Sequence, residues 1–368
     1  MKKILVLLLA LALVLGLVAC GGDGASTDTD ASAPSSDASV NATSDKVSDT
    51  ASSGSSDSEE DSKVEEDFPN LVLAIDQIKE RAVVYDLDAF EEGDSLEDVE
   101  VWSVKTGHAA GLKYREDTVF GDVVIIGGSK SAIYEYPSGR EIWSTDKPGN
   151  NTHSVEILPS GNIVLANSTG NSLRFFYTSA LLKGDAAGAQ KFKDYELEGA
   201  HGVLWDPEYD VLWGLGGYEL VAYAVTGSGT SEKIAKVGGM GCSLVGLGYG
   251  HDLQPDYTDS RYLYFTAGNV FRFDKDENKA GGFAHSTKMQ IEEIKGFSNN
   301  PSNHFFRTGD LGGEGKFFAD SRKESWLTDT IVHFEIVERK GKTLLETKEY
   351  VATESAFYKL RSFCGRYQ

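Results

Sequence analysis

The sequence predicts an all-β domain built from six repeats, because one pattern recurs six times after residue 68. Each copy is a short apolar strand, a tight loop, and then an apolar residue, two variable residues and an aromatic residue. The aromatic residues are Tyr85, Tyr136, Phe176, Tyr223, Phe273 and Phe334. They lie 40 to 61 residues apart. Several short strands in each such period are typical of the blades of a β-propeller.

Each repeat also predicts an outer strand. The first copy joins Leu71–Asp76 to residues 82–85, and the sixth joins Trp326–Thr330 to residues 331–334. The stretches that follow four of the copies read as outer strands: Val99–Val104, Arg140–Thr145, Phe192–Leu197 and Lys288–Ile294. Helical periodicity is limited to Ser179–Gln190, which we expect to be a loop insertion.

An inner strand precedes most copies. The segments that begin at His153 and His201 align without a gap, and those at His251 and Lys295 fit the same frame. The second repeat opens at Gly107-His108 with a slightly longer turn. With this inner strand, each of these blades has four strands.

The first repeat has no inner strand of its own, whereas an orphan strand, Ala356–Phe363, follows the sixth repeat. A last strand that completes the first blade closes a propeller ring and protects its edges from pairing with another chain. The sequence therefore predicts a six-bladed β-propeller of four-stranded blades over residues 68–368, closed by the C-terminal strand.

The N-terminus reads as an export signal. Two lysines precede an apolar run from Ile4 to Val18, which is short for a spanning helix. The run ends in Leu17-Val-Ala-Cys20, which resembles the lipobox of bacterial lipoproteins. The resemblance implies that residues 1–19 are removed and that Cys20 receives lipid on its thiol and its new N-terminus. We then expect a lipid-anchored protein at the extracytoplasmic face of the cell membrane, with the bilayer as a partner.

Residues 20–67 read as a disordered tether, because they hold almost nothing apolar. Thirteen acidic residues between positions 21 and 67 oppose only Lys46 and Lys63, so half of the net charge of −22 lies there.

The net negative charge of the chain and the lack of a basic patch exclude a nucleic-acid-binding surface. We expect a monomer. Cys242 and Cys364 could pair, but nothing in the sequence requires it.

The chain resembles a family of uncharacterised six-bladed propellers carried on bacterial lipoproteins. The resemblance covers about Phe68–Gln368 and depends on the blade pattern and on the histidines that open the blades. It implies the fold and brings no established activity.

The candidate site lies where residues from every blade converge, at one end of the ring. Four of the seven histidines take the same blade position. The candidate ligand-binding residues are those that enter the inner strands and those between second and third strands: His108, His153, His201, His251, Lys295, Asp76, Lys130, Asn167, Tyr218, Asn269, Asp329 and, from the last strand, Arg361. We expect the glycine-rich segment Gly238–Gly250, which carries Cys242, to form a rim over this site.

Three interpretations of the histidines remain open. His153, His201 and His251 could hold Zn or Mn, as in propeller-fold polysaccharide lyases, which they resemble in architecture but not in motif. Alternatively, histidines beside a lysine and an arginine could hold a carboxylate, sulfate or phosphate. Gly-His before an inner strand also serves a structural network in other propellers, but the Trp-Asp partner of that network is absent here.

We therefore expect recognition of an anionic small molecule or carbohydrate at the histidines. The alternatives are a metal-assisted polysaccharide lyase or hydrolase at the same site, with catalytic residues unassigned, and a non-catalytic scaffold for protein interactions.

Overall fold

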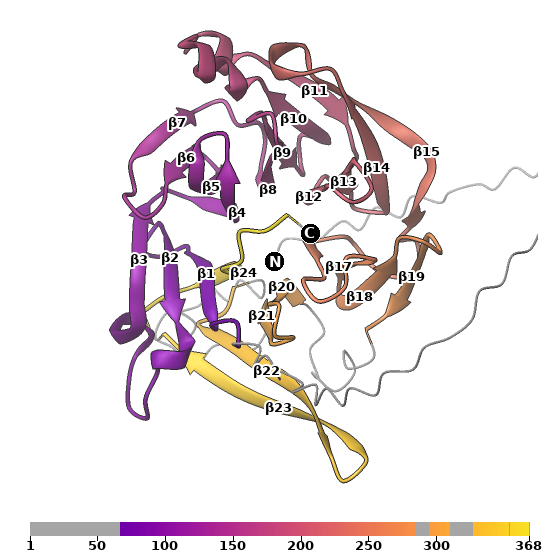
Figure 1. Cartoon of the computed structure of the whole chain (residues 1–368). Coiled ribbons are helices and arrows are strands. Elements are labelled where there is room, and N and C mark those ends of the chain that lie inside the picture. The colour runs from indigo at the N-terminus through magenta and orange to yellow at the C-terminus, as the bar shows by residue number, and fades with distance from the viewer. Residues whose placement is uncertain (1–66, 284–293, 310–326, 353, 368) are drawn as a thin grey trace, which may run out of the picture. The chain divides into compact units, whose positions relative to one another are not determined.

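The computed structural model describes residues 67–283, 294–309, 327–352 and 354–367. The strands of these residues form six four-stranded antiparallel sheets (Figure 1). The predicted tether and lipidated Cys20 lie outside the described residues. Of the helices in the described part, none has the length and apolar character needed to cross a membrane.

The first three sheets follow the repeats in chain order. The first holds β24 (Phe357–Ser362), β1 (Leu71–Asp76), β2 (Arg81–Asp86) and β3 (Glu100–Lys105). The second holds β4 (Ala109–Thr118), β5 (Gly121–Gly128), β6 (Ser131–Glu135) and β7 (Glu141–Thr145). The third holds β8 (Thr152–Ile157), β9 (Ile163–Asn167), β10 (Ser172–Phe176) and β11 (Phe192–Glu196).

The other three sheets have the same order. The fourth holds β12 (Gly202–Asp206), β13 (Val211–Leu215), β14 (Glu219–Thr226) and β15 (Lys233–Ser243). The fifth holds β16 (Asp252–Pro255), β17 (Tyr262–Ala267), β18 (Asn269–Asp274) and β19 (Lys279–Gly282). The sixth holds β20 (Ile294–Asn299), β21 (Phe305–Gly309), β22 (Thr330–Arg339) and β23 (Lys342–Val351).

Short 3₁₀ helices lie in the connections. They are η1 (Leu87–Ala89), η2 (Leu96–Val99), η3 (Thr178–Lys183), η4 (Gly188–Gln190) and η5 (Gly229–Ser231). η3 and η4 are the predicted helical insertion, and they lie between β10 and β11 of the third blade.

The six inner strands form a closed ring. β4 contacts β8, β8 contacts β12, and the contacts continue through β16, β20 and β24 back to β4. β24 pairs antiparallel with β1, so the last strand of the chain completes the first blade, as Figure 1 shows where yellow meets indigo. The predicted six-bladed, four-stranded propeller is confirmed.

The core lies between blades rather than in one centre. Because side chains alternate across each strand, every blade offers two apolar faces to its neighbours. Leu73 and Trp102 of the first blade pack with Leu112 and Val124 of the second, and similar clusters fill the other junctions. Trp102 also donates to the carbonyl oxygen of Pro137 in the next blade at 2.9 Å.

Glycines let the inner strands approach each other closely. A Cβ on Gly111 of β4 would lie 2.8 Å from the Ser154 Cα of β8, and one on Gly202 would lie 2.6 Å from the Leu253 Cβ. The narrow centre therefore requires residues without side chains at these positions.

Three details of the predicted blades were wrong. The second strand of the sixth blade is β21, which ends at Gly309, whereas β22 begins at Thr330 and Thr328 bridges to Phe357. The outer strand of the fifth blade is β19, and Ile294 belongs to the inner strand β20; residues 288–293 lie outside the described residues. Of the expected rim Gly238–Gly250, Gly238–Ser243 continues the outer strand β15, whereas residues 244–250 form a loop in which Tyr249 packs against His201 and His251.

Candidate functional site

Three of the four blade-opening histidines meet at one end of the ring. His153 is the second residue of β8, whereas His201 and His251 immediately precede β12 and β16. The ring centroids of His153 and His201 are 4.3 Å apart, and those of His201 and His251 are 5.3 Å apart. Neighbouring blades thus place three imidazoles in contact.

Three further side chains complete this group. The Lys295 ammonium lies 3.1 Å from Nε2 of His251, and the Tyr358 hydroxyl lies 3.1 Å from Nδ1 of His153. The Tyr249 ring packs against His201 and His251, with centroids at 5.3 and 5.8 Å. We call His153, His201, His251, Lys295, Tyr249 and Tyr358 the histidine cluster.

The imidazoles of the cluster are held neutral. Burial first, and the nearby Lys359 ammonium second, lower the pKa of His201 to about 4. Burial and Lys295 lower the pKa of His251 to about 3, and burial with neighbouring positive groups takes the pKa of His153 far below its usual range. At neutral pH these rings offer one donor and one acceptor each.

The hydrogen bonds fix two of the tautomers. Nδ1 of His201 donates to the carbonyl oxygen of Gly199 at 2.8 Å, so its Nε2 is an acceptor. Nε2 of His251 accepts from the Lys295 ammonium, so its Nδ1 carries the hydrogen. That Nδ1 is buried and has no hydrogen-bond partner among the described residues. The cluster therefore contains a buried donor that lacks an acceptor.

A lysine lies beneath the cluster and ties its backbone together. The Lys359 ammonium donates to the carbonyl oxygens of His153 at 3.0 Å, His201 at 3.3 Å and His251 at 2.5 Å. Its Nζ is also 3.5 Å from the Asp252 carboxylate. Burial lowers the pKa of Lys359 to about 8, although Asp252 opposes this shift.

The centre of the ring below Lys359 is filled by ion pairs. Arg361 makes a bidentate pair with Asp252 at 2.8 and 2.7 Å. Deeper still, Glu156 accepts from Lys113 at 2.7 Å and from Arg115 at 3.0 and 2.7 Å.

The C-terminal segment packs on these ion pairs from the side away from the histidine cluster. The Tyr367 hydroxyl donates to the Ile157 carbonyl oxygen at 2.9 Å, and the Arg115 guanidinium lies 4.9 Å from the Tyr367 ring centroid. Figure 1 places the C-terminus at the centre of the ring.

These buried groups carry an excess of positive charge. The cations Lys113, Arg115, Lys359 and Arg361 oppose the anions Glu156 and Asp252, and Lys295 adds another cation in the cluster. Burial lowers the pKa of Lys113 to about 7, whereas Arg115 and Lys113 hold the pKa of Glu156 at about 2 against the effect of its burial. The electrostatic potential of this arrangement favours an anion.

Several other predicted residues do not join the cluster. His108 is exposed, and its side chain takes no part in the contacts described above. Lys130 turns outward and pairs with Glu141 of β7 at 2.6 Å. Asn269 is exposed as the first residue of β18.

The buried polar residues between second and third strands mainly shape their own loops. Asp76 accepts from the backbone nitrogens of Ile78 and Lys79, which closes the β1–β2 turn. Asn167 accepts from the Thr152 hydroxyl at 2.7 Å, and Asp329 accepts from the Thr330 hydroxyl at 2.8 Å. Asp76 and Asn167 are the last residues of β1 and β9, so their partners depend on how the strands fold together and not on the sequence pattern.

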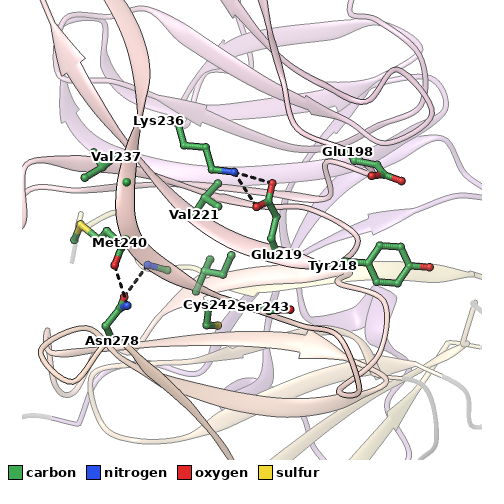
Figure 2. A pocket seen from close by; sticks show the side chains of 14 residues that line it. Glu198, Tyr218, Glu219, Val221, Lys236, Val237, Met240, Cys242, Ser243 and Asn278 are labelled. Atoms are coloured by element: carbon green, nitrogen blue, oxygen red, sulfur yellow. Dashed lines mark hydrogen bonds and ion pairs between the residues drawn. The ribbon is translucent and has the colours of Figure 1, made fainter. Parts of the chain in front are cut away.

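Tyr218 connects the histidine cluster to a groove. Its half-exposed ring packs edge-on against Tyr249, with centroids 5.3 Å apart. Tyr218 also lines a groove of about 780 Å³ beside β15. Glu219, Cys242 and Asn278 line the same groove (Figure 2). Cys242 and Cys364 are both free thiols, and burial raises the pKa of Cys242 to about 11.

A second histidine group escaped the sequence analysis. Among the described residues, the only three ligand-type side chains close enough to share a metal ion are His304, His333 and Glu335. His333 and Glu335 lie two residues apart on β22 and so share a face, which a sequence pattern could have indicated. His304 directly precedes β21, and the antiparallel pairing of β21 with β22, in which Phe305 lies opposite Phe334, brings it next to them.

Comparisons with known proteins agree with the fold and add no activity. Residues 127–308 match a family of unknown function (DUF6528), from β5 through β21. No curated protein sequence matches the chain. A chain in the crystal structure of a nidogen/laminin complex superposes with a TM-score of 0.51 at 9% identity, over 80% of this chain and 99% of that chain.

Two bacterial structures of unknown function are also similar. One, from Bacteroides caccae, has a TM-score of 0.48 at 11% identity and covers 80% of this chain and 98% of that chain. The other, from Desulfotomaculum acetoxidans, has a TM-score of 0.46 at 13% identity and covers 78% of this chain and 96% of that chain.

Proposed function

We propose that the propeller binds an anionic ligand, a carboxylated or sulfated carbohydrate, at the histidine cluster. The observation that carries the proposal is the excess of buried cations beneath neutral imidazoles, of which His251 keeps a buried N–H without an acceptor. An anionic oxygen would satisfy that donor and offset the positive charge.

The charge at the cluster argues for an anion over a metal ion. A cation bound by His153, His201 and His251 would lie beside the Lys295 ammonium, which already uses Nε2 of His251. Zinc needs such lone pairs free, and like charges repel at this distance. The metal-assisted lyase or hydrolase therefore has less support from the geometry than ligand binding.

The aromatic residues favour a sugar as the carrier of the charge. Tyr249 and Tyr218 are partly exposed and lead from the cluster to the groove beside β15. Apolar faces of sugar rings pack against such aromatic rings, while the charged group enters the polar site. An oligosaccharide could thus occupy both the cluster and the groove.

We also propose that the propeller acts at a membrane surface as a lipid-anchored extracytoplasmic monomer. The support is the lipobox-like sequence that ends at Cys20. Detergent phase partitioning of the full chain expressed in bacteria tests this proposal. The wild type should enter the detergent phase and Cys20→Ala the aqueous phase; equal partitioning would contradict it.

The binding proposal is tested by titrating the full chain with glucuronate and, in parallel, with uncharged glucose. We expect glucuronate to bind more tightly than glucose, and more tightly at pH 5.5 than at pH 8, because a bound anion favours protonation of the imidazoles. The His153→Ala/His201→Ala double variant should lose this binding. Lys130→Ala is the matched control, since Lys130 points to Glu141 and should leave binding unchanged. Equal binding by the double variant and the wild type would refute the site.

A further inference from the structure

A separate group of ligand-type side chains lies at the junction of the sixth and first blades. Nε2 of His333 is 3.2 Å from Nδ1 of His304, and both nitrogens are 3.8 Å from Oε1 of Glu335. Oδ1 of Asn70, which directly precedes β1, is 2.8 Å from Nδ1 of His304. Three potential ligand atoms thus lie within 4.8 Å of one another, and the Asn70 oxygen lies beside one of them.

These separations match a metal site. Zinc binds imidazole nitrogen and carboxylate oxygen at about 2.0–2.2 Å, so tetrahedral ligand atoms are roughly 3.3 Å apart. Two imidazoles and one glutamate are also a donor set that zinc and related first-row divalent ions accept. We propose that His304, His333 and Glu335 bind a divalent transition-metal ion, with zinc as the reference ion and Asn70 available as a fourth ligand.

Each ligand is held in place by the fold. His333 stacks on Phe306 of the neighbouring strand, with centroids 5.1 Å apart and planes at 18°. His304 ends a hairpin turn in which its N–H donates to Oδ1 of Asn300 at 2.9 Å. Such support reduces the conformational entropy that ion binding would otherwise cost.

The same support extends to Asn70. The Asn70 amide group donates from Nδ2 to Asp88 at 2.7 Å and accepts on Oδ1 from Asn300 at 3.1 Å. Its oxygen is therefore directed toward His304 rather than away from it.

The charge around this group suits a cation. Glu335 and Asp88 line the adjoining depression of about 350 Å³, together with Glu346 and Lys348. Glu346 is paired with Arg339 at 2.7 Å, and Lys348 lies over the rings of Phe90 and Tyr350. Two carboxylates thus face one ammonium, which is the reverse of the charge balance at the histidine cluster.

An ion at this point would join the last blade to the first. His304, His333 and Glu335 belong to the sixth blade, whereas Asn70 leads into β1. The backbone N–H of Phe68 already donates to the Ser302 hydroxyl at 2.6 Å, which fastens the same two segments. We therefore assign the ion a structural role at the junction of the sixth and first blades.

The test is a zinc titration of the full chain, purified without affinity histidines, followed by calorimetry and by the visible spectrum of the Co²⁺ form. We expect one equivalent to bind, the thermal midpoint to rise, and Co²⁺ to give the intense visible bands of a four-coordinate site. His333→Ala and Glu335→Gln should each weaken zinc binding at least tenfold and abolish the rise.

His108→Ala is the control, because it removes an exposed histidine outside both histidine groups. The His153→Ala/His201→Ala double variant separates the two groups and should keep full zinc affinity. The proposal is overturned if zinc binding survives His333→Ala and Glu335→Gln, or if it disappears in the His153→Ala/His201→Ala variant alone. Because the test measures metal binding, its result is independent of whether an anion binds at the histidine cluster.

Discussion

Arg361 and Asp252, 109 positions apart in the sequence, form a bidentate ion pair in the centre of the propeller. Arg361 comes from the strand that completes the first blade, and Asp252 begins the inner strand of the fifth blade. Both side chains are almost fully buried. The pair joins the C-terminal strand to the inner strand two places along the ring, across β20 of the sixth blade, beneath the candidate binding site.

Arg361→Ala should strongly destabilise the protein. Removing one partner of a buried ion pair leaves an uncompensated charge and typically costs about 3–5 kcal/mol of the free energy of unfolding. Urea denaturation followed by tryptophan fluorescence measures this loss. Lys130→Ala, which removes a cation from an exposed pair, should leave the midpoint unchanged. A similar small effect for both variants would show that the central pair contributes little.

Gly111→Ala should also destabilise the fold, because its Cβ would lie 2.8 Å from the Ser154 Cα on the next inner strand. Overpacking of this kind costs about 1–3 kcal/mol. Gly281→Ala is the matched control, since no atom lies within 4 Å of its Cβ position. Chemical denaturation of both variants checks the prediction, and equal midpoints would contradict it.

Tyr367→Ala should destabilise the packing of the C-terminal segment on the central ion pairs. The ring lies against Arg115 and its hydroxyl donates to Ile157, so its loss should cost about 1–3 kcal/mol. Hydrogen exchange should then increase in β4 and β8, which carry Arg115 and Glu156. Unchanged exchange in those strands would mean that the C-terminal segment does not protect them.

The stability of the protein should fall as the pH is lowered from 6.5 toward 4. The folded-state pKa of His201 is about 4 and that of His251 about 3, whereas an unfolded chain has the ordinary value near 6.5. Between these values the unfolded state binds more protons, so acid favours unfolding. His201 alone would contribute roughly 3 kcal/mol across this range.

The measurement is the free energy of unfolding as a function of pH for the wild type and His201→Gln. The variant should show a shallower decline between pH 6.5 and 4, since one titrating group has been removed. His108→Gln, at an exposed position, should keep the wild-type slope. Identical slopes for the wild type and His201→Gln would show that His201 is not held neutral by the fold.

The repeating architecture was readable from the sequence alone, because each blade needs the same alternation of apolar strands and turns. The aromatic residue of the third strand and the orphan strand at the C-terminus were enough to predict six blades and their closure. The sixth blade was misread at its second strand, since the sequence separation between Gly309, which ends β21, and Thr330, which begins β22, breaks the period on which the prediction depended.

The convergence of His153, His201, His251 and Lys295 also followed from the repeat, because equivalent positions in every blade lie at one end of the ring. Only the tertiary structure decided what surrounds them. Burial first, and the Lys359 ammonium beneath them in addition, keep the three histidines neutral, and Lys130 turned outward to Glu141. His304 and His333 became neighbours through the pairing of β21 with β22. A repeat determines where a position lies in its blade, whereas charge, burial and side-chain partners arise between blades, where residues distant in the sequence meet.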